Sequence, residues 1–95
     1  MNVRITRGTF DPSTSEEQLI ALTEASGDAI KKQPGFVSFQ GGLNVQAGTL
    51  VAISTWQDED SANFPREALG PVVSQIKDLG VQLEAPEIYD VAATA

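Results

Sequence analysis

A chain of 95 residues is long enough for one domain with a modest core, since folding at this size buries roughly two thirds of the surface that the unfolded chain exposes. The net charge of −7, from six Lys and Arg against thirteen Asp and Glu, argues against binding to nucleic acid or to an anionic membrane, because both require a basic face. The chain has no cysteine and no histidine, which excludes disulfides, thiolate metal sites, Ser-His-Asp triads and a haem held by a histidine of this chain.

The chain shows no targeting or membrane signal and no internal division. No charged amino-terminal segment precedes an apolar region, and no apolar run approaches about 18 residues. We therefore expect a cytoplasmic protein that is neither exported nor inserted into a membrane. No repeat, linker or low-complexity stretch interrupts the chain, so we expect a single domain over residues 1–95.

The amino-terminal third predicts a strand followed by a helix. Residues 2–8 alternate in side-chain size, as is typical of a strand. Thr14 and Glu17 have the spacing of a capping box, so we expect a helix to begin there and to end at Pro34-Gly35. The apolar stripe of this helix comprises Leu19, Leu22, Ala25, Ala29 and Ile30.

Glycines interrupt this helix and the strand that follows it. Gly27 lies inside the helix, where glycine costs about 1 kcal/mol relative to alanine, so we expect a kink or a close packing contact. Period-two alternation predicts a long strand from Phe36 to Gln46. The pair Gly41-Gly42 in its middle favours a bend or a bulge, and a short turn stays open as the alternative.

A third strand and a short helix come next. The strand is predicted over 49–56, after a tight connection at Ala47-Gly48. Asp58 is a good helix N-cap, and capping explains the acids at 58–60 better than a metal site does, because three adjacent carboxylates cannot all face one ion. Pro65 limits this helix to little more than a turn or two.

The carboxyl-terminal part completes a β-α-β-β-α-β order. Pro71 starts a second helical piece, and Gly80 ends it. Extended structure resumes over 81–84 and 87–91, and Pro86 between them favours a sheet edge or a bulge. This order predicts an α+β fold of the ferredoxin-like type, with an antiparallel sheet and two helices on one face. The other face must be polar or must pack against a partner.

Three segments of the chain are together similar to those of a known family. They are the helix end Pro34–Phe36, the strand Leu50–Trp56 and the helix start Asp58–Ala62. These segments resemble the antibiotic biosynthesis monooxygenase family of the dimeric α+β barrel superfamily. The resemblance implies a homodimer whose two sheets pack together as a barrel, with a pocket in each subunit between sheet and helices.

The resemblance also implies a range of activities. The family includes oxygenases that oxidise aromatic polyketide phenols to quinones without metal or flavin, haem-degrading enzymes and proteins that process quorum signals. In the haem-degrading members of the family that this chain resembles, a histidine of the pocket binds the iron. This chain has no histidine, so we do not expect that activity. We expect no metal and no cofactor, and a small apolar or aromatic ligand.

Trp56 is the only site residue that the resemblance carries over, since a tryptophan at the end of the third strand is often a pocket residue in the oxygenases. Its indole N–H could donate to a bound oxygen function, and the alternative is a core tryptophan that pins the second helix to the sheet. Arg66, beside the helix break, and Tyr89, in the last strand, are the other catalytic candidates. The alternative to a catalytic role is exposure to solvent for Arg66 and packing for Tyr89.

The candidates for substrate contact are Trp56, Phe39, Phe64 and Asn44. Asn44 lies on the polar side of the long strand. We favour a dimer interface for this side of the strand, and contact with a ligand is the less favoured alternative. Arg4 and Arg7 lie on opposite faces of the first strand, so at most one of them points into a given cavity. A surface ion pair is the favoured interpretation for each.

Two functions remain open. The first is a cofactor-independent monooxygenase acting on an electron-rich aromatic, in which the substrate gives an electron to oxygen while the protein supplies desolvation and a few donors. The second is a non-catalytic module that binds a small apolar molecule or only dimerises. A cavity lined by Trp56 and at least two polar groups would favour the first, and a filled core the second.

Overall fold

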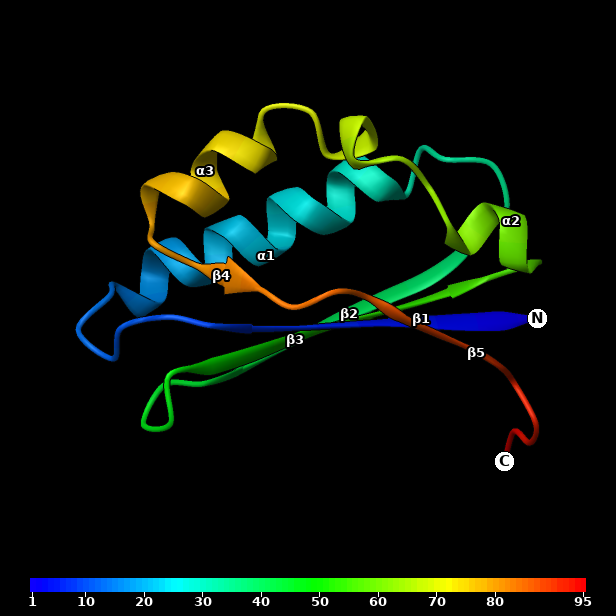
Figure 1. Ribbon diagram of the computed structural model, residues 1–95, viewed down its shortest axis with the longest axis horizontal. Coiled ribbons are helices and arrows are strands. Elements are labelled where there is room, and N and C mark those ends of the chain that lie inside the picture. The colour runs from blue at the N-terminus through cyan, green and yellow to red at the C-terminus, as the bar shows by residue number, and fades with distance from the viewer.

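The computed structural model describes residues 1–95 as a layer of helices on a layer of sheet (Figure 1). The elements are β1 (Asn2–Thr9), α1 (Glu16–Ile30), β2 (Phe36–Asn44), β3 (Thr49–Trp56), α2 (Glu59–Ala62), the 3-10 helix η1 (Arg66–Leu69), α3 (Val72–Asp78), β4 (Gln82–Leu83) and β5 (Glu87–Asp90). The strand order is β2-β3-β1-β4, with β5 also paired to β1, and all pairs are antiparallel. The predicted α+β, ferredoxin-like fold is confirmed. No helix is long and apolar enough to cross a bilayer.

The helices cover one face of the sheet only. Figure 1 shows α1 and α3 above the strands, while nothing covers the opposite face. Prolines divide the second helical region, as predicted: Pro65 has extended backbone between α2 and η1, and Pro71 precedes α3. Pro86 separates β4 from β5, and because the Glu84 N–H still donates to the Arg7 carbonyl at 2.8 Å, the gap in the pairing with β1 lies at residues 85–86. The candidate site opens beside this gap.

Helix α1 begins one residue later than predicted. Its N-cap is Ser15 and not Thr14, and the Ser15 hydroxyl accepts the N–H of Gln18 at 3.3 Å. The reason is the turn that precedes the helix. The Asp11 carbonyl accepts the N–H of Thr14 at 2.8 Å, and the Asp11 carboxylate accepts that of Ser13 at 2.9 Å. Thr14 therefore belongs to the turn.

The irregularity of β2 lies at Val37, so the prediction of a bulge at Gly41-Gly42 was wrong. The pairing of β2 with β3 shifts between Phe36 and Ser38 and is regular from there to the end of the strand. The bulge falls next to the turn that follows α1, where the strand first joins the sheet.

The glycines of α1 and β2 serve close packing between these two elements. A Cβ on Gly41 would lie 2.1 Å from Cγ2 of Thr23, and a Cβ on Gly27 would lie 2.8 Å from the ring of Phe39. The close contact predicted at Gly27 is thus confirmed. An open groove of about 680 Å³ runs along the outer side of α1 over β2. The enclosed space between the layers lies under α1, η1 and α3.

Buried apolar residues form two clusters and not one continuous core. The first lies under α1 and α3 and comprises Phe10, Leu19, Leu22, Val72 and Val81. The second joins the end of β3 to α1 and α2 and comprises Ile30, Trp56 and Ala62. A core divided in this way leaves room between the clusters for a cavity.

Strand β1 presents polar residues to the helices and apolar residues to the open side. Arg4 pairs with Ser54 in the register with β3, and Ile5 pairs with Ile53. Directly paired residues project to the same side of a sheet. The helix-covered positions of β1 are Asn2, Arg4, Thr6 and Gly8. This is the reverse of the usual pattern, in which the covered face is apolar.

We expect Gly35→Ala to destabilise the protein more than Gly80→Ala. Both glycines have positive φ, +81° and +71°, which costs alanine about 1–2 kcal/mol. At Gly35 a Cβ would also lie 2.2 Å from Oγ of Ser61 in α2, which adds about 1–3 kcal/mol, whereas nothing lies within 4 Å at Gly80. Urea denaturation measures both losses, and equal losses would contradict the contact between this turn and α2.

Candidate functional site

An inner cavity of about 120 Å³ lies between the sheet and the helices. Most of its wall is apolar and comes from α1, β3, η1 and α3. Its polar lining residues are Arg4, Thr6, Thr23, Ser26 and Ser54. Hydroxyls of α1 are already engaged, since Thr23 and Ser26 donate to carbonyls one turn earlier in the helix at 2.9 Å. The hydrogen-bond donors available to a ligand are therefore those of the sheet.

A wider mouth of about 560 Å³ connects this cavity to solvent beside the gap at Pro86. The mouth and the inner cavity share seven lining residues, including Arg4 and Phe64, so they form one continuous space. The charged residues at the rim of the mouth are Arg66, Lys77 and Glu84. The site is thus apolar within and charged at its opening.

Arg4 is the one charged side chain of the inner cavity. Its Nη1 donates to the carbonyl of Ala62 at 2.8 Å, and its guanidinium lies 4.0 Å from the ring centre of Phe64. The chain has two ion pairs, neither of which involves Arg4. Burial lowers the pKa of Arg4, but a guanidinium stays charged at neutral pH. A half-buried cation without a carboxylate partner therefore faces an apolar cavity.

Ser54 is the second polar group, and its hydroxyl is directed by Trp56. The indole Nε1–H donates to Oγ of Ser54 at 2.8 Å, and both side chains are buried. Since the indole occupies an acceptor position of the hydroxyl, the Ser54 proton is available to donate to a ligand. Ser54 is the direct partner of Arg4 in the sheet. Two donors therefore lie side by side at the sheet wall of the cavity.

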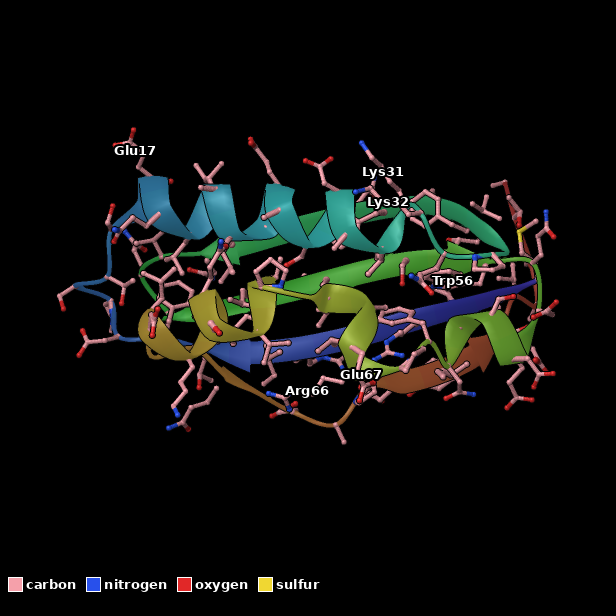
Figure 2. All side chains as sticks on the ribbon, turned by 90° about the horizontal axis from the view of Figure 1, so that it is seen from above. Glu17, Lys31, Lys32, Trp56, Arg66 and Glu67 are labelled. Atoms are coloured by element: carbon pink, nitrogen blue, oxygen red, sulfur yellow. The ribbon has the colours of Figure 1, made fainter.

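Trp56 lies one layer behind the cavity wall. It is 0% exposed, and its ring packs edge-on against Phe36 at 5.5 Å and tilted against Phe64 at 5.1 Å between centroids. It does not line the cavity, whereas its contacts Phe64 and Ser54 do. It also shares a buried cluster with Ala62, which ties α2 to the sheet. Figure 2 shows Trp56 enclosed at the end of β3, near α2.

Three other predicted site residues meet at this site. Phe39 and Phe64 line the inner cavity, and Arg66 lines the mouth. Phe64 and Arg66 are neighbours at the start of η1, whereas Phe39 comes from β2, which is distant in sequence and is brought to them by the packing of the helical layer on the sheet.

Two predicted site residues lie elsewhere. Asn44 is at the exposed end of β2, where its Oδ1 accepts the N–H of Ala47 at 3.1 Å in the turn to β3. Tyr89 is 49% exposed on the open side of the sheet, and its hydroxyl donates to the carboxylate of Glu87. Neither side chain lines the inner cavity or its mouth.

The sequence favoured a surface ion pair for both arginines of the first strand. This is correct for Arg7, which pairs with Glu87 on the exposed surface, and wrong for Arg4. The sequence feature that bears on the position of Arg4 is the alternation along β1, in which Val3 and Ile5 form an apolar side opposite Arg4. Assigning that apolar side to the uncovered face would have placed Arg4 under the helices.

Comparison with known proteins supports the fold. Neither a family model nor a curated protein matches the chain by sequence. Among solved structures, SnoaB, a cofactor-independent oxygenase from Streptomyces nogalater, has a TM-score of 0.73 and 19% identity over 98% of this chain and 94% of that one. HapK from Hahella chejuensis has a TM-score of 0.74 and 13% identity over 100% of this chain and 96% of that one.

A third similar structure carries the family's name. It is a Deinococcus radiodurans protein provisionally assigned as an antibiotic biosynthesis monooxygenase, with a TM-score of 0.71 and 14% identity over 100% of this chain and 96% of that one. These likenesses support the resemblance that the sequence indicated, and the chain has the fold of the antibiotic biosynthesis monooxygenases.

Proposed function

We propose that this protein is a cofactor-independent monooxygenase that oxidises an electron-rich aromatic molecule bound in the inner cavity. The observation that carries the proposal is the pair of donors formed by Arg4, which lacks a carboxylate partner, and Ser54, whose proton is unused, in an otherwise apolar cavity. The fold shared with SnoaB, described as a cofactor-independent oxygenase, is consistent with it.

The dimensions of the site fit an aromatic ligand. A hollow of about 150 Å³ in another protein accepts benzene, so the inner cavity of about 120 Å³ is close to the size of one ring. Further rings of a larger ligand would extend into the mouth, whose volume of about 560 Å³ is typical of small-molecule sites.

The chemistry requires the protein to stabilise an anion and to exclude water. A phenol that loses its proton can reduce O₂, and the ring carbon para to the hydroxyl then takes one oxygen atom while the other leaves as water, which yields a quinone. A guanidinium and a hydroxyl donor at the phenolic oxygen would lower the pKa of the substrate and stabilise the phenolate. Apolar walls strengthen these interactions because they keep the local dielectric low. The phenolic proton would leave through the mouth to solvent, and the departing oxygen, which carries the hydrogen of the ring carbon, would take up one proton from solvent to leave as water.

Oxygen uptake with a panel of anthrone-type phenols and other hydroxylated aromatics tests this function. We expect Arg4→Gln to lower kcat/KM by about a hundredfold or more, as loss of a donor to a developing oxyanion does. Arg7→Gln is the matched control, since Arg7 lies on the same strand but on the opposite face. It should change the rate by less than about twofold. No uptake by the wild type, or equal losses in both variants, would refute the mechanism.

A second experiment tests the pair formed by Trp56 and Ser54. We expect Trp56→Phe and Ser54→Ala each to reduce kcat by about tenfold or more, and the double variant to lose no more than the worse single variant, because the two side chains act as one donor unit. Phe36→Leu is the control: Phe36 packs on Trp56 but does not line the cavity, so it should lose stability without a comparable loss of kcat. Multiplying losses in the double variant would contradict the coupling.

We further propose that two copies pair through the uncovered face of the sheet, as the resemblance implies. The open face carries the aliphatic residues Val3, Ile5, Val51 and Ile53 with Tyr89, and among its polar residues are Arg7, Ser38, Gln40, Thr55 and Glu87. Its aliphatic members are only partly buried, and water would contact them in a single copy. A stable dimer buries about 1,200 Å² or more, and a sheet face with aliphatic residues among polar ones is suited to such an interface.

Light scattering after size-exclusion chromatography tests the dimer. We expect the wild type to elute at twice the monomer mass and Ile53→Glu to elute as a monomer, because a buried carboxylate without a partner costs several kcal/mol. Ile20→Glu is the control, since Ile20 is 44% exposed on α1, away from the open face. A monomeric wild type, or a dimeric Ile53→Glu, would rule out this interface.

A further inference from the structure

The cations of this acidic chain gather at the proposed site. The chain has six Lys and Arg, of which Arg7 and Lys31 form ion pairs with carboxylates. The remaining four have no carboxylate within the 4.0 Å of an ion pair, and three of them line the inner cavity or its mouth: Arg4, Arg66 and Lys77. The fourth, Lys32, follows α1 and lies on the opposite side of the helical layer from Arg66 (Figure 2).

Acidic residues show the opposite distribution. The chain has thirteen Asp and Glu, more than twice the number of its cations, yet Glu84 is the only acid that lines the mouth, and none lines the inner cavity. The site is therefore locally positive in a protein of net charge −7. Like charges that converge on one pocket repel one another, and a bound anion relieves this repulsion.

The positive charges occupy two ends of the site. Arg4 lies in the inner cavity beside Ser54, whereas Arg66 and Lys77 lie at the rim on η1 and α3. Figure 2 shows Arg66 beside the segment that joins β4 to β5, where the mouth opens. Between the two ends the shared walls are apolar and include Phe64 and Ile76. A matching ligand has an apolar body with one acidic group at each end.

We propose that the substrate is a hydroxylated aromatic carboxylic acid whose ring hydroxyl meets Arg4 and whose carboxylate lies at the rim between Arg66 and Lys77. This inference rests on the proposed function, which concerns the ring and its hydroxyl, and adds the second anionic group. The rim carries two cations and Glu84, so its excess is a single positive charge. That excess matches a carboxylate and is smaller than the charge of a phosphate dianion.

Calorimetric titration with two probes that differ only at the far end tests the proposal. The probes are 6-hydroxy-2-naphthoate and the neutral 6-hydroxy-2-naphthamide, which have the same rings and the same hydroxyl. We expect the wild type to bind the carboxylate about tenfold more tightly than the amide, as two ion pairs with the exposed Arg66 and Lys77 would produce.

Charge-matched variants identify the residues responsible. The double variant Arg66→Gln, Lys77→Gln should remove the preference for the carboxylate and change the affinity for the amide by less than about twofold. Lys31→Gln, Lys32→Gln removes the same number of positive charges on the far side of the helical layer and should keep the preference.

The outcomes separate this inference from the proposed function. Equal affinity of the wild type for both probes, or an unchanged preference in the Arg66, Lys77 variant, would overturn the carboxylate site while the ring site stands. Loss of the preference in the Lys31, Lys32 variant would also overturn it, because the effect would then be that of net charge. Failure of both probes to bind the wild type would refute the ring site and the carboxylate site together.

Discussion

The register of β1 against β3 is the constraint on which the rest of the structure depends. Arg4 pairs with Ser54 and Ile5 pairs with Ile53, so the polar side of β1 faces the helices and its apolar side faces outward. A slip of one residue would exchange the two sides completely, because side chains alternate along a strand. It would place Ile5 in the cavity and leave Arg4 on the open face. The polar end of the cavity and the apolar open face are thus two results of one pairing.

The aromatic cluster at the end of β3 connects stability to the site. Trp56 is fully buried and holds Phe64 against one side of its ring, while its N–H holds the hydroxyl of Ser54. Phe64 in turn lies under the guanidinium of Arg4. The two donors of the cavity are therefore positioned by the same buried indole, one through a ring contact and the other through a hydrogen bond. Rigid support of this kind is what donors to a transient anion require.

A chain without histidine restricts how the site can act. Arg4 stays charged over the whole physiological pH range, and the hydroxyl of Ser54 does not titrate there, so neither is suited to move a proton between groups. What they can do is stabilise charge that forms on a bound molecule. Under the proposed mechanism the electrons and the proton come from the substrate, and the protein contributes a fixed electrostatic environment in a water-poor cavity.

Much of the fold was determined by local sequence signals. Period-two alternation identified β2 and β3, the N-cap at Asp58 started α2, and Pro65 and Pro71 divided the second helical region where the structure has its breaks. These signals act within a few residues, so they can be recognised without knowing what packs against them. The glycine pair of β2 misled the prediction of the bulge because Gly41 makes room for Thr23 of α1, a residue distant in sequence.

The site itself was decided by tertiary structure. The sequence alone established that histidine, cysteine and their chemistry are absent, and it singled out Trp56, Phe39, Phe64 and Arg66, which the fold does bring to one region. It did not single out Ser54, and it treated Arg4 and Arg7 alike, with a surface ion pair favoured for each, because the alternation along a strand does not by itself show which side the helices cover. Which face of β1 is covered depends on where α1 and α3 pack, and that packing turned one arginine of the strand into a surface ion pair and the other into the unpaired cation of the cavity.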